Sequence, residues 1–158
     1  MGPILLSFDR QFTSIDDSSR QLLNLMPEEM LYRRPREIQR QLTPFSCGEY
    51  ILRSAAMVEK TFGGITTRLW DDPFEWTLPE KVSSKKSVLE YLDDVEKTRS
   101  AGFAFIASDD QLVRSIPSPE KIRPIIAVIL ECISEASHYQ GRAFAIFQML
   151  SNEKLPRL

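Results

Sequence analysis

The residue types that most often carry chemistry are scarce in this sequence, and the most informative ones lie in two short segments. The single histidine, His138, begins the run His138-Tyr139-Gln140-Gly141-Arg142, and Cys47 follows Ser46 at the predicted start of a helix. The sequence has no glycine-rich phosphate loop, no Cys-x-x-Cys pair and no Gly-x-Ser-x-Gly nucleophile motif. One histidine is also too few for a histidine-rich metal site. The sequence therefore lacks the familiar catalytic motifs.

A cysteine nucleophile is one hypothesis. Cys47 lies in the predicted first turn of a helix, where the helix dipole can lower the pKa of a thiol and favour the thiolate. A Cys–His pair would in addition need His138 within hydrogen-bond reach. The alternative is that Cys47 is a small residue packed behind the helix cap. Whether the protein is an enzyme stays open at this point.

Four stretches have apolar residues at spacings of three and four, which predicts amphipathic helices. They cover residues of about 12–26, 47–62, 84–105 and 122–150. The sequence therefore predicts an all-α protein, a four-helix bundle with long connectors, built as one domain over residues 1–158.

Capping residues predict where these helices begin and end. Ser46 and Glu49 have the spacing of a capping box at the start of the second helix, and Gly63-Gly64 marks its predicted end. Pro124 fits the first turn of the last helix, where its missing N–H costs nothing. No segment resembles a strand pair or a hairpin turn.

Composition excludes several classes of partner. Apolar residues make up 42% of the chain and charged residues 27%, with a net charge of −2, which is ordinary for a globular protein. The nearest feature to a basic patch is Arg33, Arg34, Arg36 and Arg40, which is weaker than a duplex-binding surface, so we expect no nucleic-acid partner. The longest uncharged apolar run, residues 125–130, is too short to cross a bilayer, so we expect no membrane span. Two cysteines give no disulfide framework and favour a cytoplasmic location.

The connector between the second and third helices is rich in aromatic residues, including Trp70, Phe74 and Trp76. Aromatic side chains gather at interaction sites when they are exposed. The alternative is that this Trp70–Trp76 loop folds over the bundle and caps one end of it.

Three segments together resemble the DinB-like superfamily. They are Leu31-Tyr32-Arg33-Arg34-Pro35, then Ser46-Cys47-Gly48-Glu49-Tyr50-Ile51-Leu52, and in the last helix Ser134-Glu135-Ala136-Ser137-His138-Tyr139-Gln140-Gly141-Arg142. The resemblance implies a four-helix bundle and a homodimer. It also implies, for many members, a divalent metal such as Ni²⁺ or Zn²⁺ held by three histidines, and for some members the transfer of small thiols.

The sequence departs from that pattern at the metal ligands. The family's histidine in the second helix falls on Arg53, the first histidine of the last helix falls on Ser134, and only the second remains, as His138. Arg142 replaces a glutamine. Because a guanidinium has no lone pair to donate and stays protonated, we expect a degenerate site without a metal cofactor. If a metal does bind, His138, Glu131 and Glu135 are the expected ligands.

Several functions remain open for this protein of unknown function. In the family geometry, Arg53, Ser134, His138 and Arg142 would line a polar cleft between the second and last helices and bind a small carboxylate or phosphate. The alternative without a ligand is that Arg53 pairs with Glu49, Glu131 or Glu135 and that His138 has no special role. Two further alternatives are a metal-dependent hydrolase or thiol S-transferase of the DinB-like type, and a non-catalytic dimeric interaction protein.

Overall fold

The chain folds into a bundle of long helices, as the apolar spacing predicts. The structure, a computed structural model, describes residues 1–35, 44–73 and 76–156. In these residues it has four long α-helices, two short 3₁₀ segments and one two-stranded sheet. The elements in order are α1 (Pro3–Leu25), η1 (Glu28–Met30), α2 (Cys47–Thr67), α3 (Lys85–Ile106), η3 (Asp109–Val113), β1 (Ser115–Pro117), β2 (Ile122–Pro124) and α4 (Ile125–Leu150). The all-α prediction is confirmed.

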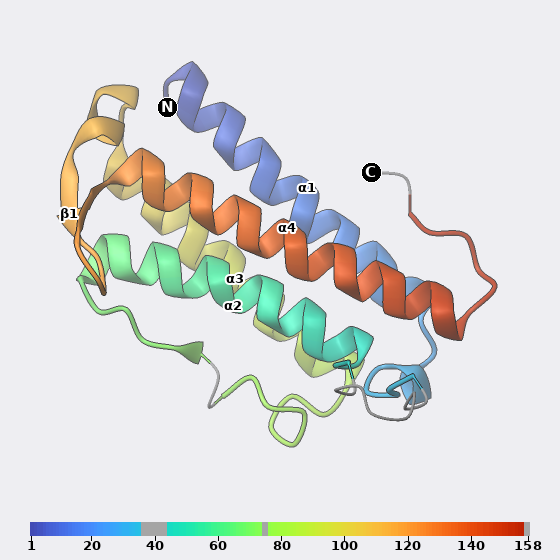
Figure 1. Cartoon of the computed structure of the whole chain (residues 1–158). Coiled ribbons are helices and arrows are strands. Elements are labelled where there is room, and N and C mark those ends of the chain that lie inside the picture. Colours follow the sequence, from blue (N-terminus) through green and yellow to red (C-terminus); the bar gives the residue numbers. More distant parts are fainter. Residues whose placement is uncertain (36–43, 74–75, 157–158) are drawn as a thin grey trace.

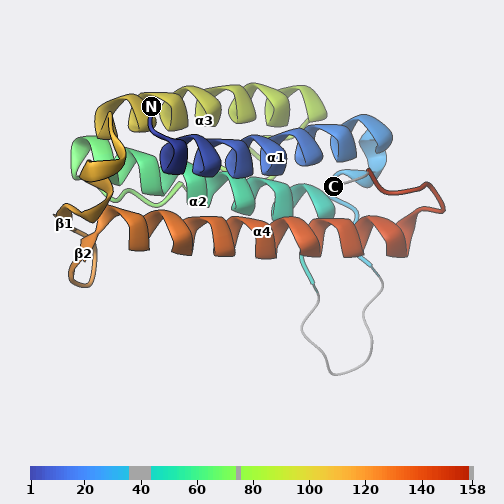
Figure 2. The ribbon, with the colours of Figure 1, turned by 90° about the horizontal axis from the view of Figure 1, so that it is seen from above.

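The four helices do not alternate in direction along the chain. Figures 1 and 2 show α1 and α4 running in one direction, and α2 and α3 running in the other. Consecutive parallel helices need a connection that returns along the whole bundle, and residues 68–84 form that connection between α2 and α3. This topology explains the long connectors that the sequence predicts.

The core is filled by side chains from all four helices. Phe12 of α1, Phe62 of α2 and Phe103 of α3 meet at its centre, with ring centroids 5.2 Å apart for Phe12–Phe62 and 4.9 Å apart for Phe62–Phe103. Each of these rings is at most 2% exposed. No helix of the described residues is long and apolar enough to cross a membrane.

The sequence predicts the start of α2 correctly and the start of α1 incorrectly. Ser46 and Glu49 form the capping box, with the Ser46 hydroxyl accepting from the Glu49 N–H and the Glu49 carboxylate accepting from the Ser46 N–H. α1 begins at Pro3 rather than near residue 12. No neighbouring side chain caps the first turn of α1. The Asp109 carboxylate caps it instead, by accepting hydrogen bonds from the N–H groups of Ile4 and Leu5.

The predicted end of α2 at Gly63-Gly64 is also wrong. The helix passes through both glycines and ends after Thr67, where Arg68 takes the left-handed conformation with φ of 65°. Gly64 lies beneath the indole of Trp70, which leaves no room for a β-carbon. The glycine is therefore needed for a close contact and does not end the helix.

The sheet is a further departure from the prediction, which contained no strands. β1 and β2 pair antiparallel, with Ile116 opposite Arg123. The residues of β2 lie in the stretch 122–150 that the apolar spacing predicts as helix. Pro124 caps α4 from outside rather than lying in its first turn.

The Trp70–Trp76 loop folds back onto the bundle in its described part. The indole of Trp70 donates to the carbonyl of Pro117 in β1 at 3.2 Å, and that of Trp76 donates to the Glu59 carboxylate at 3.4 Å. Trp70 is partly buried, whereas Trp76 is 42% exposed. Phe74 lies outside the described residues. The capping alternative is supported for Trp70.

Candidate functional site

The register of α2 against α4 decides which predicted site residues share a level of the bundle. α2 packs against α4 more extensively than any other described helix pair. The Ser54 hydroxyl donates to the Ala136 carbonyl at 2.8 Å, and the Cys47 thiol donates to the Ala143 carbonyl at 3.4 Å. Because the two helices are antiparallel, these bonds place Arg53 level with the turn of α4 that runs from Ser134 to His138.

Aromatic rings connect the basic residues of this region. The guanidinium carbon of Arg53 lies 4.0 Å from the centroid of the Phe45 ring. Phe45 meets Tyr50 edge to face at 5.6 Å, and Tyr50 lies stacked against Tyr139 at 6.4 Å. We call Phe45, Tyr50 and Tyr139 the aromatic patch.

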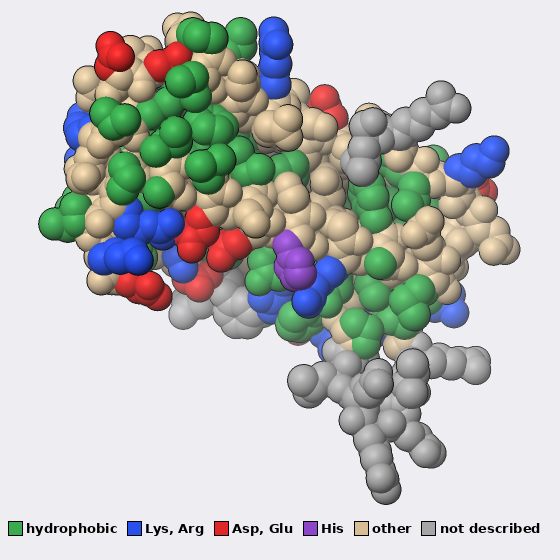
Figure 3. All heavy atoms as spheres, turned by 45° about the horizontal axis from the view of Figure 1, so that its top comes forward, with side chains coloured by type: hydrophobic (Ala, Val, Ile, Leu, Met, Phe, Trp, Pro, Cys, Tyr) green, Lys and Arg blue, Asp and Glu red, His purple; other side chains and the backbone are tan. Residues whose placement is uncertain are grey.

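The two other basic residues of the site touch the same patch from α4. The guanidinium of Arg142 lies 5.8 Å from the Tyr50 centroid, and the His138 ring lies 5.8 Å from that of Tyr139. His138 and Arg142 are exposed, and Figure 3 shows His138 on the surface with hydrophobic and basic side chains beside it. The structure thus brings Arg53, His138 and Arg142 onto one aromatic surface.

Ser134 is the predicted site residue that the structure does not bring into this group. It is exposed, one turn before His138, and makes no hydrogen bond with a described residue through its side chain.

A third arginine, Arg34, lies at the edge of the patch. Arg34 lies 5.7 Å from the Phe45 centroid and pairs with Glu49 through two hydrogen bonds, of 3.2 Å from Nε and 2.5 Å from Nη2. Burial acts to raise the pKa of Glu49, but the hydrogen bonds from Arg34 and Ser46 outweigh it and lower that pKa below its ordinary value. The ion pair with Glu49 balances the charge of Arg34. Arg36 and Arg40 lie outside the described residues.

The sequence did not identify the aromatic patch or Arg34. Phe45 precedes the helix cap and Tyr139 lies on another helix, so no spacing within one segment connects them. The adjacency of Tyr139 to His138 was a weak signal for one ring.

The donors of the predicted metal site do not fit a divalent cation. Glu131 is paired with Arg123, Arg53 offers no lone pair, and Glu135 and His138 alone would leave a four-coordinate ion short of ligands. Among the residues that the structure describes, no three His, Cys, Asp or Glu side chains are grouped to hold a metal.

The hypothesis of an activated Cys47 thiolate is wrong. The side chain is fully buried behind the cap of α2, and burial raises the pKa of its thiol to about 12. Desolvation here outweighs the helix dipole, because the neutral thiol avoids the cost of placing a charge in the core. Cys132 is buried in the same way, and the pKa of its thiol is also about 12.

A groove does lie between α2 and α4, but one turn nearer the sheet than predicted. It has a volume of about 230 Å³, and Trp70, Lys60, Arg123, Glu131 and Glu135 contribute to its walls. Lys60 pairs with Asp72 and Arg123 with Glu131. Because carboxylates balance its cations, this groove suits an anion less well than the aromatic patch.

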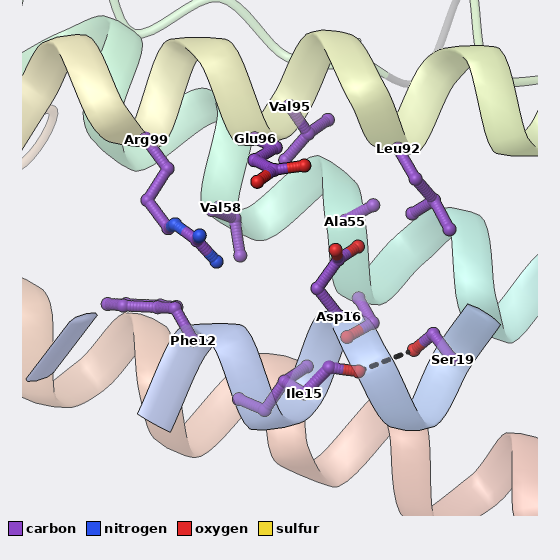
Figure 4. A pocket seen from close by; sticks show the side chains of 11 residues that line it. Phe12, Ile15, Asp16, Ser19, Ala55, Val58, Leu92, Val95, Glu96 and Arg99 are labelled. Carbon is purple, nitrogen blue, oxygen red and sulfur yellow. Dashed lines mark hydrogen bonds between the residues drawn. The ribbon is translucent and has the colours of Figure 1, made fainter. Parts of the chain in front are cut away.

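A smaller cavity lies inside the bundle between α1, α2 and α3. Figure 4 shows Asp16 of α1 and Glu96 and Arg99 of α3 around it. Its volume of about 20 Å³ has room for one water molecule. Burial raises the pKa of the Asp16 carboxyl, against the opposing hydrogen bond from Arg20. The space is too small for an organic ligand, and its polar groups connect α1 to α3.

Comparison with known proteins adds no family to this description. No protein-family model and no curated protein matches the sequence.

Proposed function

We propose that the protein is a binding module for a small ligand that carries both an anionic group and a flat ring. It would be a DinB-like bundle whose metal site has been replaced by the aromatic patch and its arginines. As part of this proposal, we place the protein in the cytoplasm as a homodimer. The observation that carries the proposal is the guanidinium of Arg53 against the Phe45 ring at 4.0 Å, level with His138 of the neighbouring helix.

A guanidinium stacked on a ring is held in one plane, and its N–H groups point along that plane. Those groups can grip a carboxylate or a phosphate with two parallel hydrogen bonds. Arg142, against Tyr50 on the other side of the patch, adds a second positive charge. A ligand with a flat ring could stack on the partly exposed edges of Phe45 and Tyr139 while its anion meets the arginines.

The test is a ligand-observed NMR screen of aromatic carboxylates and aryl phosphates, followed by titration of the hits. Arg53→Gln and Arg142→Gln should each weaken a hit at least tenfold, because each removes a charge-assisted hydrogen bond of about 1.5–3 kcal/mol. Arg10→Gln is the matched control, since Arg10 is exposed on α1 and loses the same charge. Unchanged affinity in both patch variants would remove the proposal. Hits that bind through the ring alone, without salt dependence, would also contradict it.

A further inference from the structure

The connection between α2 and α3 lines a pocket that the proposed function does not use. Residues 68–84 return along α2, as Figure 1 shows, and their described part encloses a space of about 430 Å³ together with α2 and α3. Pockets that bind small molecules usually have about 300–1,000 Å³, so this space can hold an organic ligand. We call it the connector pocket. The lining residues that matter here are Glu59, Gly63 and Thr66 of α2, Asp71 and Trp76 of the connection, and Thr98 of α3.

Glu59 is fixed in the connector pocket by two donors that share one of its carboxylate oxygens. The Tyr91 hydroxyl donates to Oε2 at 2.5 Å, and the Trp76 indole N–H donates to the same atom at 3.4 Å. Burial and the adjacent Glu59 carboxylate raise the pKa of Tyr91, so its hydroxyl stays a donor. Because no described residue donates to Oε1, one oxygen of a positioned carboxylate is left for a ligand.

The other polar side chains of the pocket also present acceptors. Asp71 is exposed, and its carboxylate makes no hydrogen bond or ion pair with a described residue. The Thr66 hydroxyl donates to the Phe62 carbonyl at 2.9 Å, and the Thr98 hydroxyl donates to the Asp94 carbonyl at 3.1 Å. Since each hydroxyl hydrogen is used within its own helix, the oxygen lone pairs are what a ligand would meet.

The charge of the pocket favours a cation. Among the described residues that line it, Lys60 is the basic one, and it pairs with Asp72 at 3.7 Å. Glu59 and Asp71 add negative charge that no described cation balances. The Trp76 side chain is 42% exposed beside them, and an indole ring attracts both a cation and the carbon chain that carries it.

We propose that the connector pocket binds an organic primary ammonium ion, with its N–H groups on the Glu59 carboxylate and its aliphatic body against Trp76. Asp71 contributes negative charge, and the threonine oxygens accept from the remaining N–H groups. The pocket lies between α2 and α3 and takes a cation, whereas the aromatic patch lies between α2 and α4 and takes an anion. The two sites therefore stand or fall separately.

The test is a titration of ¹⁵N-labelled protein with hexylamine at pH 7, where the amine is protonated. The chain has two tryptophans and so two indole N–H signals in the NMR spectrum. The Trp76 signal should move and saturate, whereas the Trp70 signal should not, because that indole donates to Pro117 outside the pocket. Hexanol, without the charge, and hexyltrimethylammonium, without N–H groups, should each bind at least tenfold more weakly.

Two variants test the site without removing the fold. Glu59→Gln keeps an acceptor for Tyr91 but loses the charge, and should weaken hexylamine binding at least tenfold. Glu29→Gln is its matched control, because Glu29 is exposed and does not line the pocket.

The second variant fills the pocket. A β-carbon at Gly63 would meet nothing within 4 Å, so Gly63→Leu places its side chain in the open space and should abolish binding. Gly141→Leu, at an equally open glycine of α4, should leave binding unchanged. Circular dichroism of each variant checks that the helices are kept.

Three results would overturn the proposal. They are a Trp76 signal that does not move at about 10 mM hexylamine, equal affinity for hexanol, and unchanged affinity in Gly63→Leu. Equal affinity for hexyltrimethylammonium would overturn the assignment to a primary amine.

Discussion

The carboxylate of Asp109 accepts a hydrogen bond from the backbone N–H of Leu5 at 2.9 Å, across 104 residues of sequence. Its other oxygen accepts from Ile4 at 3.0 Å. Asp109 begins the segment after α3, so the first helix of the bundle is capped by a residue that follows the third. α1 is thereby held at the end of the bundle where the sheet lies.

Removal of this cap should destabilise the fold. Asp109→Ala should lower the free energy of unfolding by about 0.5–2 kcal/mol, the usual cost of losing a capping side chain. Asp110→Ala loses the same charge from an exposed neighbour and should change stability by less than about 0.5 kcal/mol. Urea unfolding followed by circular dichroism measures both. Equal effects from the two variants would mean that charge, rather than the cap, matters.

The two adjacent glycines of α2 should respond in opposite ways to the same substitution. A β-carbon at Gly64 would lie 2.4 Å from the Trp70 ring, whereas one at Gly63 would meet nothing within 4 Å. Gly63→Ala should stabilise the protein by up to about 1 kcal/mol through helix propensity. Gly64→Ala should destabilise it and shift the tryptophan emission, because the indole must move. Thermal unfolding and fluorescence spectra report the two effects, and an unchanged spectrum in Gly64→Ala would contradict the contact.

Both cysteines should be inert in the folded protein. Burial raises the pKa of Cys47 and of Cys132 to about 12, so neither thiol ionises near pH 8. An aromatic disulfide reagent should therefore react with both thiols in denaturant and with neither in native buffer. Since the folded pKa lies above the unfolded value of about 8.5, the thiols reduce stability as the pH rises from about 8.5 towards 12. The double variant Cys47→Ala/Cys132→Ala should lose less stability than the parent over that pH range. Rapid reaction of the native parent with the disulfide reagent would contradict the burial of the thiols.

The Arg34–Glu49 pair predicts a pH dependence of the opposite sign. The pKa of Glu49 is lowered in the fold, so the pair contributes stability above the unfolded pKa of about 4.3 and loses it as the pH falls through the folded value. Glu49→Gln keeps a capping residue but removes the charge, and should cost a few tenths to about 1 kcal/mol at pH 7, because Arg34 is half exposed. The difference from the parent should shrink as the pH falls through the folded pKa of Glu49. Glu153→Gln, in the exposed C-terminal segment, serves as the control with the same change of charge.

The sequence predicted best the features that neighbouring residues decide. The capping box of Ser46 and Glu49 lies within one turn, and the structure has it as expected. The start of α1 depends on Asp109, far away in sequence, and no local signal points to Pro3. The strands have three residues each and end in Pro117 and Pro124, which is too short for an alternating pattern.

Most of the candidate site likewise depends on contacts between helices, which the sequence of one segment does not predict. The level shared by Arg53 and His138 is implied by the resemblance to the DinB-like superfamily, and no spacing within either helix predicts it. The aromatic patch between them could not be expected from the sequence, since Phe45, Tyr50 and Tyr139 meet only after α2 and α4 have packed. The burial of Cys47 was likewise decided by packing rather than by its place in the first turn.

The parallel pairing of α1 and α4 sets the order in which the protein can be completed during translation. The hydrogen bond between Ile15 and Gln140 joins residues 125 positions apart. At a synthesis rate of about 5–20 residues per second, the inner face of α1 waits roughly 6–25 s for its neighbour. During that interval its leucines and phenylalanines are open to chaperones and to other nascent chains. A ribosome that stalls before α4 is made would therefore release a product that cannot close its core.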